Sequence, residues 1–87
     1  MNDNKRNIMF RLRDVMGATG RCKASIYDLI KRGLLTPPVK IGERASGWPS
    51  WEIEKIVAAQ ISGKSEGVIK TLVSDLVKDR ETAFVGN

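Results

Sequence analysis

The hydrophobic positions of this 87-residue chain form short periodic segments separated by glycine and proline. The clearest segment is residues 22–32. With a step of about 100° per residue, Ile26, Leu29 and Ile30 fall on one side of a helix, as core-facing residues do. Gly33 follows as a C-terminal stop signal, and Thr19-Gly20 precedes the segment as a tight turn. The pattern predicts a helix over 22–32.

A very short helix is predicted before this one. Leu12, Val15 and Met16 supply its apolar side, Asp14 lies in its first turn, and it ends either at Gly17 or at Thr19-Gly20. The two helices together are typical of a helix-turn-helix. The outward face of the second helix combines cations, a small residue, an aromatic hydroxyl and an acid. That composition is typical both of a binding face and of an inert solvated surface. Its members are Lys23, Ala24, Tyr27, Asp28, Lys31 and Arg32.

The next part of the chain predicts a β-hairpin. Residues 34–38 end in Pro37-Pro38, which favours an extended connector. Val39-Lys40-Ile41 alternates as a strand, residues 42–47 are typical of a turn, and the chain returns at Trp48. We expect a hairpin over 38–49 with Arg44 at its tip, to which a short strand at 10–12 adds. The two tryptophans, at positions 48 and 51, are expected to close the core over it.

Two further helices are predicted at 51–62, with Ser50 as N-cap, and at about 66–81, capped near Ser65. The last helix has an apolar stripe with 3–4 spacing, which is too short for an autonomous coiled coil. It packs on its own domain, pairs with a second copy, or both, and we favour pairing. The expected oligomerisation residues are Ile69, Leu72, Val73, Leu76 and Val77. The predicted organisation is a flexible arm (1–9), a helix-turn-helix domain with the hairpin (10–62) and a C-terminal oligomerisation element (63–87).

Charge is distributed unevenly. Residues 1–44 carry ten Lys/Arg against four Asp/Glu, whereas residues 45–87 carry five against six, within a total net charge of +5. A basic half joined to a near-neutral half fits a polyanion-binding face attached to a packing element. A small domain with an ordinary charge excess fits as well.

Enzyme chemistry has little support in the sequence. The chain has one cysteine and no histidine, so the commonest metal ligand and general base are missing, and no metal or cofactor is expected. No nucleotide-binding or hydrolase motif occurs. Cys22 lies between Arg21 and Lys23, which would favour a thiolate, but a small residue at a cap position explains it more simply. No apolar run has the roughly 20 residues of a membrane span, so a cytoplasmic protein is expected.

Several motifs in order resemble the AlpA family of small regulators encoded by prophages and mobile islands. These are R-L-R-D-V-M-G-A-T-G (11–20), S-I-Y-D-L-I-K-R-G (25–33), P-V-K-I-G-E-R (38–44), Trp48 and W-E-I-E (51–54). The resemblance covers about residues 10–62. It implies a mainly α fold with a small β-hairpin, a MerR- and excisionase-like winged helix-turn-helix, to which the helix at 66–81 is added. Arg21-Cys22, where the family usually has an apolar residue and a serine or threonine cap, departs from its pattern, as does Pro49.

The resemblance implies double-stranded DNA as the partner, with helix 22–32 in the major groove and the wing at 42–47 on the adjacent minor groove or backbone. It suggests base contacts by Lys23, Ala24, Ser25, Tyr27 and Lys31, and a wing contact by Arg44. Phosphate contacts are expected from Arg11, Arg21, Arg32 and Lys40. We expect a transcriptional regulator that acts as a homodimer or cooperative oligomer on DNA. The alternatives are an excisionase-type architectural protein and a protein-interaction module that inhibits a partner regulator.

Overall fold

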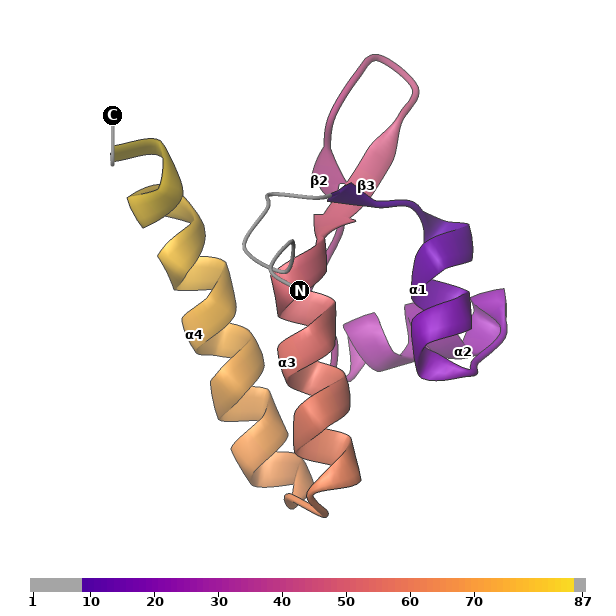
Figure 1. Cartoon of the computed structure of the whole chain (residues 1–87), viewed down its shortest axis with the longest axis vertical. Coiled ribbons are helices and arrows are strands. Elements are labelled where there is room, and N and C mark those ends of the chain that lie inside the picture. Colours follow the sequence, from indigo (N-terminus) through magenta and orange to yellow (C-terminus); the bar gives the residue numbers. More distant parts are fainter. Residues whose placement is uncertain (1–8, 86–87) are drawn as a thin grey trace, which may run out of the picture.

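The computed structural model describes the backbone of residues 9–85 and the side chains of residues 9–81. The described residues form four helices and a small three-stranded sheet, which lies toward one end of the molecule (Figure 1). This confirms the predicted mainly α, winged helix-turn-helix architecture with an added C-terminal helix. The predicted arm at 1–9 lies outside the described residues, apart from Met9. In chain order the elements are β1 (Met9–Phe10), α1 (Leu12–Thr19), α2 (Lys23–Lys31), β2 (Val39–Lys40), β3 (Ser46–Pro49), α3 (Ser50–Ile61) and α4 (Glu66–Val85).

The helix-turn-helix forms where the glycines predict it. Asp14 Oδ2 accepts a hydrogen bond from the Arg11 backbone N–H at 2.8 Å, which satisfies one of the free donors before α1. The helix passes Gly17 and ends before Gly20, whose φ of +71° is a left-handed conformation that glycine adopts without strain. Gly33, which follows the C-cap of α2, also has a left-handed conformation, with φ +78°. The observed α2 therefore agrees with the predicted helix to within one residue at each end.

The sheet joins the beginning of the chain to the hairpin. Its order is β1-β3-β2, with both pairs antiparallel, and Phe10 lies opposite Trp48. Gly47 lies opposite Val39 in the other pair, and a Cβ added to Gly47 would be 2.9 Å from the Phe10 carbonyl oxygen. Only glycine allows this close approach of β1 to β3. The expected hairpin is confirmed. The strand expected at 10–12 forms at Met9–Phe10 instead, because Arg11 caps α1 and Leu12 begins it.

The start of α3 corrects one prediction. Ser50 is the first helical residue and is 5% exposed, and the cap position belongs to Pro49 with φ −59° and ψ 130°. The physical reason is that Pro49 is the last residue of β3, where it pairs with Met9, so the chain passes directly from strand to helix. Ser50 makes no side-chain cap, because it is already inside the helix.

One core holds all the helices. Trp48 is 1% exposed, and its indole Nε1–H donates to the Thr36 carbonyl oxygen at 2.7 Å, so the tryptophan closes the core as predicted. Trp51 is half-buried. The other buried apolar residues come from α1, α2, the connector after α2, α3 and α4. They are Val15, Ile26, Leu29, Leu34, Leu35, Ile53, Ile56, Ile69, Val73 and Leu76.

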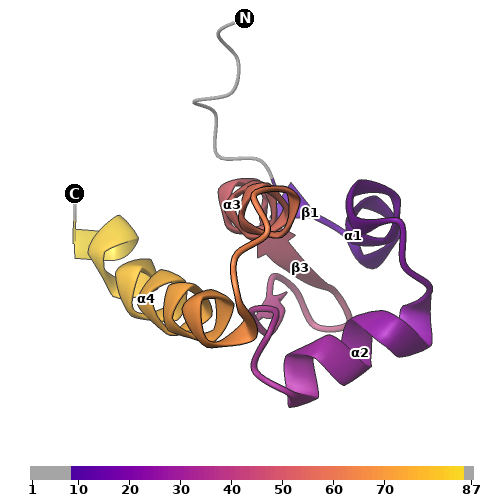
Figure 2. The same ribbon diagram turned by 90° about the horizontal axis from the view of Figure 1, so that it is seen from below.

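Helix α4 lies beside α3 (Figures 1 and 2). Ser65 accepts a hydrogen bond from the Val68 N–H at 3.3 Å and caps the helix, as expected. The segment at 63–81 thus shares its core with residues 10–62. None of the helices in the described part of the chain is long and apolar enough to cross a membrane.

Candidate nucleic-acid interface

Helix α2 buries one side and leaves the other uncovered. Ile26 and Leu29 are 0% and 4% exposed, which fixes the helix against the core. Lys23, Ala24 and Lys31 are exposed, Tyr27 is 46% exposed, and Ser25 is half-buried. In Figure 2 the helix runs along one edge of the molecule. The structure therefore presents the residues expected to contact bases on one outward face, with Ser25 at its margin.

The start of α2 has no conventional cap. Cys22 occupies the cap position with φ −83° and ψ 170°, and no side-chain cap hydrogen bond forms there. Arg21 Nη1 instead donates to Ser25 Oγ at 3.2 Å. Because of this contact, the Arg21 side chain lies on the flank of α2 that carries Ser25. Cys22 is a free, exposed thiol.

Arg32 is held at the other end of the same helix. Its Nη1 donates to Asp28 Oδ2 at 3.4 Å, and its Nη2 donates to Glu66 Oε2 at 3.0 Å. Glu66 opens α4, so this pair joins the end of α2 to the beginning of α4. The side chains of Arg32 and Glu66 are 48% and 64% exposed, and ion pairs this exposed contribute about 0–1 kcal/mol to stability.

The wing is the loop between β2 and β3. The Ile41 N–H donates to the Ala45 carbonyl oxygen at 2.9 Å and closes it, and the loop projects beyond the sheet (Figure 1). Lys40 and Arg44 are both exposed. Arg11 Nε donates to the Ser46 carbonyl oxygen at 3.2 Å, so Arg11 lies at the base of the wing. Among the described residues no hydrogen bond joins the wing to α2, and the core between them sets their relative position.

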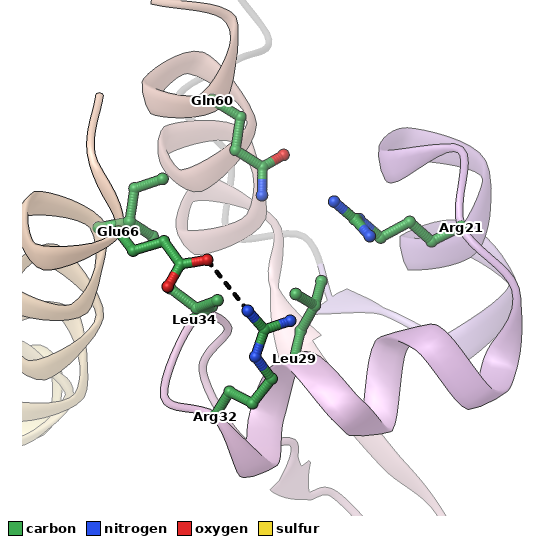
Figure 3. Close-up of a pocket in the computed structure, with 7 residues that line it drawn as sticks. Arg21, Leu29, Arg32, Leu34, Gln60 and Glu66 are labelled. Atoms are coloured by element: carbon green, nitrogen blue, oxygen red, sulfur yellow. Dashed lines mark hydrogen bonds and ion pairs between the residues drawn. The ribbon is translucent and has the colours of Figure 1, made fainter. Parts of the chain in front are cut away.

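A cavity of about 250 Å³ opens between α2, the connector after it, α3 and α4 (Figure 3). Two of the predicted DNA-contacting arginines line it, together with side chains that the sequence did not single out. Gln60 of α3 and Glu66 of α4 have no periodic signal that relates them to Arg21, because three different elements bring them together. The lining residues are Arg21, Leu29, Arg32, Leu34, Gln60, Glu66 and Ile69.

The residues expected to mediate oligomerisation divide into two groups. Ile69, Val73 and Leu76 are 6%, 7% and 4% exposed and pack in the chain's own core. Leu72 is half-buried and Val77 is 37% exposed. Of the predicted set only Val77 is exposed, and Leu72 also packs against the core.

Comparison with known proteins finds a family model and a phage relative that match most of the described domain. Residues 8–61 match the family model described as prophage CP4-57 regulatory protein (AlpA). Over 57 residues the chain is 32% identical to the uncharacterized protein ORF88 of Enterobacteria phage P4, an alignment that covers 66% of this chain and 65% of the phage protein. The chain thus spans slightly less than two thirds of that relative's length. No solved structure matches the chain.

Proposed function

Because the chain belongs to the AlpA family of prophage regulatory proteins, which is a family of regulators rather than of enzymes, we propose that it is a sequence-specific DNA-binding transcriptional regulator. Helix α2 enters the major groove, and the wing at 42–47 contacts the adjacent minor groove or backbone. The observation that carries the proposal is the division of α2 into a side fixed by Ile26 and Leu29 and an uncovered cationic side. A rigid helix with an uncovered polar face is what base recognition in a major groove requires.

In this proposal the contacts have separate tasks. Lys23, Ala24, Ser25, Tyr27 and Lys31 face base edges and give sequence preference. Cations at the ends of α2 and on the wing bind phosphates and give affinity without sequence information. These phosphate contacts come from Arg11, Arg21, Arg32, Lys40 and Arg44.

A homodimer or cooperative oligomer on DNA belongs to the same proposal. Val77 is exposed on α4 and available for contact between copies, whereas Leu72 is half-buried and packs against the chain's own core. Two copies would bind half-sites separated by about one helical turn or a multiple of it. Sedimentation of the protein with and without its DNA fragment, for wild type and Val77→Asp, measures this. An unchanged mass for every sample would exclude pairing through α4.

Selection of bound genomic DNA fragments by the purified protein tests the proposal and identifies the target. DNase footprinting of the selected fragment then locates the site. A footprint at a promoter supports a transcriptional regulator, whereas one beside an integrase arm would assign an excisionase role instead. The five proposed phosphate contacts predict a log–log salt slope of about −4.5. A shallow slope without a footprint would favour a module that docks on an acidic protein.

A further inference from the structure

The cavity beside α2 collects polar groups from three separate elements. In Figure 3 the side chains of Arg21, Arg32 and Gln60 point toward a common space from the loop before α2, from the end of α2 and from α3. Leu29, Leu34 and Ile69 form its apolar floor. At about 250 Å³ the space is large enough for a small oxyanion.

The charge of the lining favours an anion. Arg21 donates to the neutral hydroxyl of Ser25, and among the described residues no ion pair involves its guanidinium. Arg32 is shared between Asp28 and Glu66, and only Glu66 lines the cavity. The lining therefore carries two guanidinium groups against one carboxylate. Guanidinium groups have a planar fork of donors that matches the oxygens of a phosphate.

The position of the cavity on α2 also favours a phosphate. Arg21 and Arg32 lie along one flank of the helix, next to Ser25 at the margin of the outward face, because Arg21 is four positions and Arg32 seven positions from Ser25. A helix in a major groove turns its outermost face toward the bases, and the two sides of that face lie toward the two phosphate backbones. Two arginines that line the cavity thus lie on the side of α2 where a backbone phosphate would pass.

We infer that this cavity is a phosphate site, in which Arg21 and Arg32 bind the anion and Gln60 supplies a neutral third donor. The inference deepens the proposed function and rests on it for one point, the source of the phosphate. A phosphodiester of the DNA backbone and free inorganic phosphate present the same oxygens, and the experiments below separate them.

Glu66 competes with the phosphate for Arg32. Its carboxylate accepts from Arg32 Nη2 at 3.0 Å, and a second anion beside the same guanidinium is repelled by it. The pair is exposed and therefore weak, so a phosphate displaces it without large cost. Glu66→Gln removes the competing charge and is expected to tighten phosphate binding about threefold. Weaker binding by this variant would contradict the competition.

The first experiment needs no DNA. Inorganic phosphate is titrated into the ¹⁵N-labelled chain at constant ionic strength, and the side-chain N–H signals are followed by NMR. Saturable shifts are expected at Arg21 Nε, Arg32 Nε and the Gln60 amide. Arg80 is the internal control, because its guanidinium is already bound by Glu52 and Pro37. Shifts that never saturate, or that are equal at all arginines, would overturn the site.

The second experiment tests the DNA backbone as the source. Arg21→Gln and Arg32→Gln are each expected to weaken binding to the footprinted fragment about tenfold and to make the salt slope shallower by about 0.9. Lys78→Gln is the matched control, since it removes one positive charge from an exposed position about 18 Å along α4 from Glu66. Its slope should equal that of wild type.

The two experiments distinguish failure of the phosphate site from failure of the proposed function. Saturable phosphate binding with no footprint would keep the site and overturn the proposed function. A wild-type footprint, no saturable phosphate binding and unchanged slopes for the arginine variants would keep the function and overturn the site. Saturable binding with unchanged slopes would identify free phosphate as the ligand and exclude the DNA backbone.

Discussion

Arg80, near the end of α4, donates two hydrogen bonds to the carboxylate of Glu52 in the first turn of α3, at 2.8 and 2.7 Å. The Glu52 side chain is 0% exposed, and that of Arg80 is 22% exposed. Arg80 Nη2 also donates to the Pro37 carbonyl oxygen at 2.7 Å, in the connector between α2 and the wing. This one guanidinium therefore ties α4 both to α3 and to the segment that leads from α2 to the wing.

The first prediction concerns this pair. Arg80→Met leaves a buried carboxylate without a partner and is expected to lower the free energy of unfolding by about 3 kcal/mol. Urea denaturation measures it. The double variant Glu52→Leu/Arg80→Met removes both charges together and should recover much of the loss, since replacing both members of a buried pair by apolar residues is often tolerated.

Lys78→Met is the control for the Arg80 variant. It makes the same kind of change at an exposed position two residues earlier on α4. Surface substitutions of this kind usually change stability by less than about 0.5 kcal/mol. Equal effects of Arg80→Met and Lys78→Met would show that the buried pair does not hold α4.

The second prediction contrasts two glycines. Gly47→Ala is expected to destabilise the fold by about 1–3 kcal/mol, because its Cβ would be 2.9 Å from the Phe10 carbonyl oxygen, and a backbone atom cannot move away as a side chain can. Gly17→Ala is the matched substitution in α1. Apart from its chain neighbours and the backbone of its own helix, no atom lies within 4 Å of the added Cβ. Alanine also favours helix, so this variant should be more stable by about 1 kcal/mol.

Thermal or urea unfolding of both glycine variants tests the contrast. The difference in sign is what matters, since both substitutions add the same methyl group. A neutral Gly47→Ala variant would mean that β1 does not hold its observed register against β3.

The third prediction concerns Thr36, which is 0% exposed. Its hydroxyl oxygen has no hydrogen-bond partner in the described part of the chain. Thr36→Val replaces this hydroxyl with a methyl group of similar size, and is expected to leave stability unchanged or to raise it by about 1 kcal/mol. Thr36→Ala should lower it, because it removes volume from the core. Marked destabilisation by Thr36→Val would indicate a hidden partner for the hydroxyl, such as a bound water.

The fourth prediction concerns the outward face of α2. Lys23→Ala and Lys31→Ala are each expected to weaken specific DNA binding by about 1–3 kcal/mol, as loss of a base contact does. Both lysines are exposed, so unfolding should hardly change. Gel shifts on the selected fragment measure the effect. Lys55→Ala, an exposed position on α3, is the charge-matched control, and binding by all three variants like wild type would remove this face from the mechanism.

Much of the local structure was predictable from the sequence. The bounds of α2, the turn at Gly20, the hairpin and the start of α4 all depend on short-range signals. The buried stripe of Ile26 and Leu29 and the positive φ of Gly20 act within a few residues, so the sequence pattern carries them directly. The exposed positions of the α2 cations were predictable for the same reason, since helical periodicity is a local property.

Contacts between distant elements needed the tertiary structure. The apolar stripe of α4 is equally compatible with a second chain and with the chain's own core, because periodicity shows which face is buried but not against what. In the structure Ile69, Val73 and Leu76 are buried in the chain's own core. Arg80 binds Glu52, which is 28 positions earlier in the chain, because α4 runs beside α3. Glu66 binds Arg32, which is 34 positions earlier, because α4 begins near the end of α2.

The sequence by itself thus determined that this chain has a helix-turn-helix and a wing with cations on both, since spacing and turn chemistry are local properties. The tertiary structure alone decided that α4 belongs to the same core and that Arg21, Arg32 and Gln60 share one cavity. The physical reason is that such convergence depends on how whole elements pack, and a single sequence does not record the relative orientation of its elements.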